Sequence, residues 1–139
     1  MLPESETREL VERLLDSDVD LIADFHPHVV RPVEECDDKL VAYSLGNFVS
    51  WQTKDYTYFG IGLALDIIRS GERTGIAKTN IVPFYRDRSQ SVDTPSCRVI
   101  SLDIPPDELI NMADLMAMRR YRRYFVDTYG EMYEPNFSR

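Results

Sequence analysis

The sequence predicts a mixed α/β domain, and its length, composition and periodicity support this class. Its 139 residues suit one globular domain, and 43% hydrophobic with 29% charged residues is an ordinary soluble composition. Segments of helical and strand periodicity follow in the order helix, strand, strand, hairpin, strand, helix. This order also leaves an α+β arrangement open.

The two helices are predicted at the ends of the chain. The first covers residues 3–16, where Pro3 suits the first turn of a helix. Its apolar stripe consists of Leu10, Val11, Leu14 and Leu15. The last helix runs from Pro105 to about Tyr129, before a tail without clear period. Its packed face is predicted to consist of Leu109, Met112, Ala113, Met116, Ala117, Tyr121 and Tyr124.

Five strands are predicted between the helices. They cover residues 19–25, 40–45, 56–68, 75–85 and 97–102. The charged residues 34–39 predict a turn, residues 69–72 a hairpin turn, and residues 86–96 a polar loop. Pro83 predicts an interruption of the fourth strand, because proline cannot donate to a sheet ladder.

Charge is distributed unevenly along the chain. Residues 1–38 hold twelve acidic and three basic residues, whereas the remainder is nearly balanced, and the whole chain carries −8. This balance argues against a general nucleic-acid binder. The longest central apolar run, residues 58–65, is far shorter than the about 20 residues of a membrane span. No secretory signal is visible, and Cys36 and Cys97 do not make a disulfide framework, so their redox state stays open.

Two histidines flank a proline, and they are the clearest candidates for chemistry. If the strand over 19–25 stays extended, alternate residues share one face with Cα atoms ~6.6 Å apart. Asp24, His26 and His28 would then face one metal ion, or two neighbouring ions. Three donors from one strand do not complete a divalent site, and such spacing also occurs in ordinary loops.

Residues 19–48 carry two motifs in order, with Pro32-Val33-Glu34 between them. They are His26-Pro27-His28-Val29 and Tyr43-Ser44-Leu45-Gly46-Asn47-Phe48. This pattern resembles the bacterial capsule-synthesis protein family, which is CapA-like and linked to poly-γ-glutamate synthesis. The resemblance is strongest over residues 10–50.

The resemblance implies a branch of the calcineurin-like metallophosphoesterases, with a layered β-sandwich and flanking helices. It implies a dinuclear centre of Mn, Zn or Fe, with His26 and His28 each serving one ion. Asn47 follows Gly46 at the end of a predicted strand, where its amide either projects into the same cleft or simply caps the turn. A metal-bound hydroxide would attack a phosphoester substrate. It also suggests association with the cell envelope.

Two departures from the family pattern limit this implication. Phe25 stands where the family usually has a histidine, and the Asp-x-His, Gly-Asp and Gly-Asn-His motifs are absent. Residues 1–104 are therefore expected to form the C-terminal part of such a domain, followed by a helix and tail over 105–139. The missing donors would come from an N-terminal half or another chain. The isolated chain is expected to be inactive.

A second hypothesis is a non-catalytic binding module. In this hypothesis the acidic segment over residues 1–38 binds another chain, or the basic patch on the last helix binds a partner such as an anionic polymer. The patch consists of Arg119, Arg120, Arg122 and Arg123. Glu34 could orient an imidazole, although a solvated carboxylate is the simpler interpretation, and Cys36 is more easily explained as a bystander than as a ligand. Ser44 lacks a nucleophile elbow, and Gly60-Ile61-Gly62 is too short for a dinucleotide fingerprint.

Overall fold

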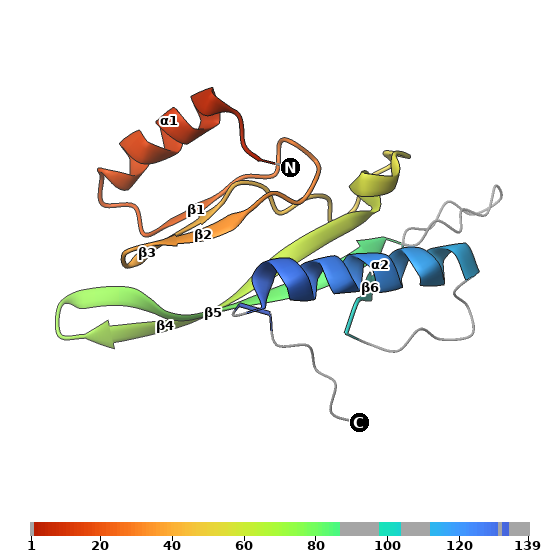
Figure 1. Ribbon diagram of the computed structural model, residues 1–139. Coiled ribbons are helices and arrows are strands. Elements are labelled where there is room, and N and C mark those ends of the chain that lie inside the picture. Colours follow the sequence, from red (N-terminus) through yellow and green to blue (C-terminus); the bar gives the residue numbers. More distant parts are fainter. Residues whose placement is uncertain (1, 87–97, 104–111, 131, 134–139) are drawn as a thin grey trace.

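The computed structural model of the chain describes residues 2–86, 98–103, 112–130 and 132–133 (Figure 1). These residues form a mixed α/β fold with two small sheets, which confirms the predicted fold class. The elements are α1 (Ser5–Leu15), β1 (Leu21–Ala23), β2 (Val33–Cys36), β3 (Lys39–Ala42), the 3-10 helix η1 (Asp55–Tyr58), β4 (Phe59–Ser70), β5 (Arg73–Arg86), β6 (Val99–Ser101) and α2 (Met112–Tyr129).

The first sheet has the strand order β1-β3-β2. β1 and β3 are parallel, whereas β2 and β3 form an antiparallel hairpin. The prediction of a charged turn over residues 34–39 was too long, because residues 34–36 belong to β2 and Lys39 begins β3. Val33 is buried and directs the strand into the core, so only Asp37 and Asp38 turn, with Asp37 at φ 58°.

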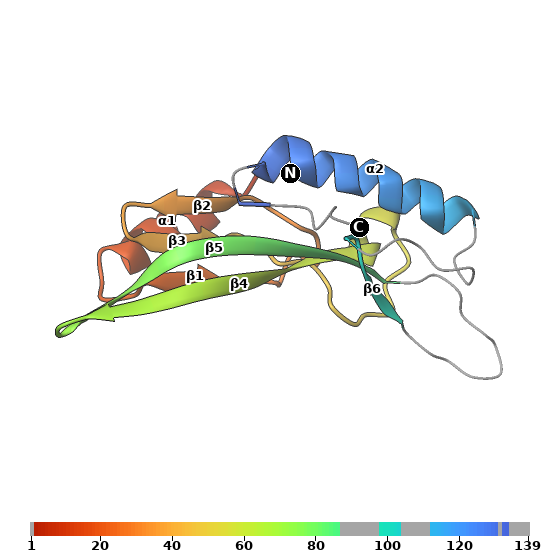
Figure 2. The ribbon, with the colours of Figure 1, turned by 90° about the horizontal axis from the view of Figure 1, so that it is seen from below.

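The second sheet has the order β4-β5-β6 and is antiparallel throughout. Gly71, at φ 64°, closes the long β4–β5 hairpin, whose tip projects beyond the body of the molecule (Figure 2). The predicted interruption at Pro83 was wrong, because Pro83 pairs with Ile61 within β5. The Pro83 carbonyl accepts from the Leu102 N–H, so the carbonyl and the nitrogen of Pro83 both point away from β4. The missing N–H of proline therefore costs no hydrogen bond between β4 and β5.

Two helices cover this arrangement from different sides. α1 packs on one face of the first sheet, where Val11, Val41 and Tyr43 form a small core. The larger core lies between the first sheet, the second sheet and α2, and it includes Leu40, Phe59, Ile61, Tyr85 and Phe125. α2 therefore covers only one face of the β4–β5 sheet (Figure 2). Gly62, Val82 and Phe84 of these two strands line the pocket described below.

The helical stripes were predicted only in part. In α1, Val11 is buried but Leu10 and Leu14 are exposed. In α2, Met112 and Met116 are 68% and 65% exposed, and Ala113 and Tyr124 are also exposed. The buried face of α2 instead contains Asp114, Ala117, Met118, Phe125 and Tyr129. The buried face of α2 thus differs from the predicted one. It includes the polar residue Asp114 because the Asp114 carboxylate accepts from the buried Tyr85 hydroxyl.

Several expectations fall outside the described residues. Residues 87–96 of the predicted loop, Cys97, Pro105, Leu109 and most of the tail belong to the undescribed ranges. Arg86, which was predicted to begin that loop, instead ends β5. The predicted strand over 97–102 corresponds to β6 at Val99–Ser101. Across the described ranges, no helix has both the length and the apolar character needed to cross a membrane.

Candidate functional site: the histidine pocket

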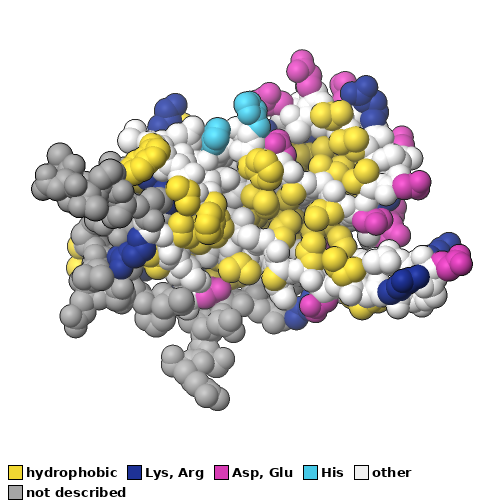
Figure 3. Space-filling view, turned by 180° about the vertical axis from the view of Figure 1, so that it is seen from behind, with side chains coloured by type: hydrophobic (Ala, Val, Ile, Leu, Met, Phe, Trp, Pro, Cys, Tyr) yellow, Lys and Arg dark blue, Asp and Glu magenta, His cyan; other side chains and the backbone are white. Residues whose placement is uncertain are grey.

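A pocket of about 870 Å³ lies where the parallel strands β1 and β3 end. The segment after β1 supplies Asp24 and both histidines, and the segment after β3 supplies Asn47. Ligand sites commonly form at the carboxyl ends of parallel strands, because the following loops converge there. The lining residues are Asp24, Phe25, His26, His28, Leu45, Gly46, Asn47, Phe48, Val49, Ile61, Gly62, Val82 and Phe84. Figure 3 shows both histidines at the rim of this face, above a run of hydrophobic side chains.

The two histidines are brought together by a turn rather than by an extended strand. The His28 N–H donates to the Phe25 carbonyl at 3.0 Å, and His28 has a left-handed φ of 59°. One carboxylate oxygen of Asp24, Oδ1, accepts from the backbone N–H groups of Phe25 and His26 at 2.7 and 2.9 Å. The expected extended geometry was therefore wrong, because Asp24 caps a tight turn.

Even so, both imidazoles line the same pocket. Their ring centroids lie 6.2 Å apart with an interplanar angle of 48°. The turn, and not the alternation of side chains along an extended strand, places His26 beside His28. Both histidines are exposed.

Asn47 fixes the orientation of the His28 ring. Its Nδ2 donates to the Thr57 carbonyl at 3.1 Å and to Gln52 Oε1 at 2.8 Å. Because a carbonyl only accepts, the remaining amide atom, Oδ1, must be the acceptor that lies 2.7 Å from His28 Nδ1. His28 therefore carries its proton on Nδ1, and Nε2 holds the lone pair of the neutral ring. This is the arrangement by which a supporting hydrogen bond prepares a histidine for coordination.

Two glycines allow the Asn47 segment to approach β4. Gly46 has a φ of 74° and forms an isolated bridge with Gly60. A Cβ at Gly60 would lie 2.4 Å from the Phe84 ring and 2.6 Å from the Asn47 carbonyl oxygen. A Cβ at Gly46, the glycine of the Leu-Gly-Asn sequence, would lie 2.7 Å from the Phe59 carbonyl oxygen. Close packing therefore requires glycine at both positions, and the left-handed φ of Gly46 also favours it.

These residues do not supply all the ligands of the dinuclear metal centre that the resemblance implies. His26 and His28 can each offer an imidazole, but the described parts of the chain contain no group of three or more His, Cys, Asp or Glu residues arranged to hold a metal ion. A divalent ion generally needs at least four ligands, so the described residues form at most part of such a centre.

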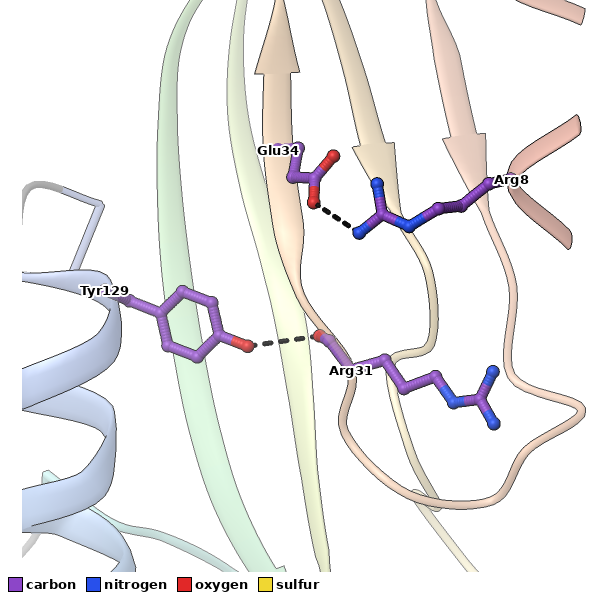
Figure 4. Close-up of polar contacts among 4 residues, drawn as sticks. All are labelled: Arg8, Arg31, Glu34 and Tyr129. Atoms are coloured by element: carbon purple, nitrogen blue, oxygen red, sulfur yellow. Dashed lines mark hydrogen bonds and ion pairs between the residues drawn. The ribbon is translucent and has the colours of Figure 1, made fainter. Parts of the chain in front are cut away.

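Other candidates from the sequence lie elsewhere. Glu34 accepts from Arg8 at 3.4 Å, between β2 and α1, and does not line the pocket (Figure 4). Cys36 is half-buried, and burial followed by the charges of Glu34 and Asp37 raises the pKa of its thiol. Ser44 is buried, and its hydroxyl accepts from the Gly46 N–H. Tyr43 is a core residue, whereas Phe48 is exposed and contacts the Phe84 ring.

The sequence analysis missed three residues that support the site: Gln52, Thr57 and Gly60. No local pattern marks Gln52 or Thr57, since each is an ordinary polar residue in a loop or short helix. Gly60 was visible as part of Gly60-Ile61-Gly62, but its role depends on Phe84, which is distant in sequence.

The basic patch is separate from the pocket. Arg119, Arg120 and Arg123 are exposed on α2, whereas Arg122 is half-buried. Arg123 forms an ion pair with Asp127 at 3.8 Å on the helix surface. No residue of α2 lines the pocket, so the two features offer independent surfaces.

The two imidazoles thus lie together at the carboxyl ends of the parallel strands of an α/β scaffold. Residues 1–52, which include both histidines and Asn47, match the family model described as bacterial capsule synthesis protein PGA_cap. This match supports, for these residues, the resemblance that the two motifs predicted. The PGA biosynthesis protein CapA of Bacillus subtilis (strain 168) is 40% identical to it over 47 residues. This match covers 34% of the chain but only 12% of that relative. No solved structure matches the chain significantly.

Proposed function

We propose that this chain acts in bacterial capsule or poly-γ-glutamate biosynthesis and contributes His26 and His28 to a metal-dependent phosphoester-processing site. The observation that supports the proposal most strongly is the His28–Asn47 hydrogen bond, which leaves Nε2 as the lone-pair nitrogen beside His26. The family match covers all three residues. The capsule-synthesis role also follows from the name of the Bacillus subtilis relative.

The site in this proposal is composite. In this proposal the described residues supply two imidazole donors and the supporting amide of Asn47. Asp24 lines the same pocket, but no three His, Cys, Asp or Glu side chains of the described residues are arranged to hold a metal ion. Polypeptide outside these residues, from the same protein or another, would supply the remaining donors. The chain alone should therefore bind Mn²⁺ or Zn²⁺ weakly and hydrolyse p-nitrophenyl phosphate no faster than buffer.

Calorimetric titration with Zn²⁺ and Mn²⁺ tests the metal role. We expect a weak heat with the wild-type chain that disappears in the double variant His26→Ala/His28→Ala. The variant Asp37→Asn/Asp38→Asn is the matched control, because it removes two exposed carboxylates away from the pocket and should keep that heat. Equal heats for the wild type and the histidine variant would contradict the metal role.

The alternative function is a non-catalytic binding module. It is favoured by the three exposed arginines of α2, which could contact the carboxylates of an anionic polymer. Titration with poly-γ-glutamate separates this alternative from the first. Binding that is lost in Arg119→Gln/Arg120→Gln/Arg123→Gln and kept in the histidine variant would favour the module. An absence of binding to the wild type would contradict it.

A further inference from the structure

We infer that Gln52 and Arg86 are positioning residues for His28 and act on it through Asn47. Neither residue lines the pocket, and both lie outside the matched family segment or at its end. The inference deepens the proposed function, on which it rests for the use of His28 as a donor. The positioning itself concerns a proton on a ring nitrogen and can be measured without any metal.

The first link joins Gln52 to Asn47. The Asn47 side chain is buried, at 5% exposure, so each of its polar atoms needs a partner. Thr57 accepts one Nδ2 hydrogen through its backbone carbonyl, and Gln52 accepts the other through Oε1. With both hydrogens engaged, the amide cannot turn Nδ2 toward His28 without losing two hydrogen bonds.

The second link joins Arg86 to Gln52. Arg86 ends β5, is 1% exposed, and donates from its Nη2 to the main-chain carbonyl of Gln52. Its guanidinium also lies 4.2 Å from the centre of the Tyr58 ring, a cation–π distance. Residues 51–53 have no helical or strand hydrogen bonding, and Gln52 is exposed. Arg86 thus ties an otherwise irregular segment to the second sheet, at the residue whose side chain holds Asn47.

The consequence of both links is a fixed tautomer of His28. A neutral imidazole carries its proton on either nitrogen, and the hydrogen bond of one nitrogen decides which lone pair is free. Here a path of contacts runs from Arg86 through Gln52 and Asn47 to His28 Nδ1. His26 provides an internal comparison, because it occupies the same turn and its ring has no such amide partner among the described residues.

The experiment is a long-range proton–nitrogen correlation spectrum of the ¹⁵N-histidine-labelled chain, recorded at a pH where both rings are neutral. We expect His28 to be mainly the Nδ1–H tautomer in the wild type. In Gln52→Ala, its ratio of Nε2–H to Nδ1–H should rise roughly fivefold, the factor of one ordinary hydrogen bond. The His26 ratio should not change. Gln52→Glu should restore the wild-type ratio, because its carboxylate accepts the same hydrogen.

Two further variants make the result decisive. Thr53→Ala changes the exposed neighbour of Gln52 and should leave the His28 tautomer unchanged. Arg86→Lys keeps the charge but loses the guanidinium geometry, and should shift the ratio in the same direction as Gln52→Ala. If Arg86→Lys does not fold, the three position-52 proteins decide the matter alone. An Nε2–H tautomer in the wild type, or a ratio unaffected by Gln52→Ala, would overturn the inference. If the tautomer ratios are as expected but the chain does not bind Zn²⁺, the proposed metal role is contradicted while the inferred positioning of His28 stands.

Discussion

His28 Nδ1 lies 2.7 Å from Asn47 Oδ1, although the two residues are 19 positions apart. One follows β1 and the other follows β3, so their contact joins the loops at the ends of two parallel strands. The His-Pro-His and Leu-Gly-Asn-Phe sequences are therefore parts of one structural unit. The predictions below test how this unit is held and what surrounds it.

The glycine at position 60 should be essential for stability. Gly60→Ala places a methyl group 2.6 Å from the Asn47 carbonyl oxygen, a backbone atom that cannot move aside easily. We expect a loss of about 1–3 kcal/mol in the free energy of unfolding, measured by urea denaturation. Gly62→Ala is the control, because its nearest contacts are at 3.9 Å, and its stability should change by less than about 0.5 kcal/mol. Equal effects of the two variants would refute the close-packing argument.

Asp24 should act mainly as the cap of the histidine turn. Asp24→Asn keeps an oxygen that accepts from the Phe25 and His26 N–H groups, so stability should be nearly unchanged. Asp24→Ala removes the acceptor and should lower the free energy of unfolding by about 1 kcal/mol. Zn²⁺ titration of both variants separates capping from coordination. If Asp24→Asn loses Zn²⁺ as completely as His28→Ala, Asp24 is a metal ligand instead.

The attachment of α2 should weaken at high pH. The Tyr129 hydroxyl donates to the Arg31 carbonyl at 3.1 Å and joins α2 to the segment after the histidine turn (Figure 4). Burial and then Tyr124 raise the pKa of Tyr129 above that of an ordinary tyrosine, and burial together with Asp103 does the same for Tyr133. A raised pKa means that the unfolded chain loses the proton first. The stability is therefore complete below about pH 10 and falls as pH rises further.

Tyr129→Phe tests this contact directly. It removes the donor to a buried carbonyl, and we expect a loss of about 1 kcal/mol at pH 7 and a shallower decline above pH 10. Tyr56→Phe alters an exposed tyrosine and serves as the control. Thermal denaturation at several pH values provides the measurement. An unchanged pH slope in Tyr129→Phe would show that another group governs alkaline unfolding.

Cys36 should react slowly with thiol reagents. The thiolate is the reactive form, and burial with the nearby carboxylates raises the pKa of this thiol. In a Cys97→Ser background, the folded chain should react with 5,5′-dithiobis(2-nitrobenzoic acid) at pH 8 several-fold more slowly than the urea-unfolded chain. Glu34→Gln should speed the reaction, since it removes one of the charges. A folded rate equal to the unfolded rate would contradict the assignment.

The sequence predicted the order of most elements because their patterns are local. The apolar run that forms β4 and the glycine turn after it act through neighbouring residues, and a hairpin was confirmed there. Its bounds differ from the prediction, because residues 56–58 belong to η1, β4 continues to Ser70, and only residues 71–72 turn. β2 was missed because Glu34 and Glu35 resemble a charged turn. Whether they form a strand depends on pairing with Val41 and Leu40 across the hairpin.

The site was predicted at the level of its residues but not of its geometry. The spacing indicated His26 and His28, and the position after Gly46 at the end of a predicted strand indicated Asn47. All three line one pocket. The turn at Asp24 was not foreseen, because extension of β1 beyond Ala23 was assumed, whereas the carboxylate captures two backbone N–H groups. The roles of Gln52 and Arg86 could not be predicted, since they depend on contacts between segments that are distant in sequence.

The most direct test of the account is a Zn²⁺ titration followed by the ¹⁵N signals of the two imidazoles. The account predicts a saturable shift of the His28 Nε2 signal with a smaller response at His26, and loss of zinc binding in His28→Ala. It is contradicted if Zn²⁺ perturbs only the acidic segments over residues 16–24 and 34–38 while both imidazole spectra stay unchanged.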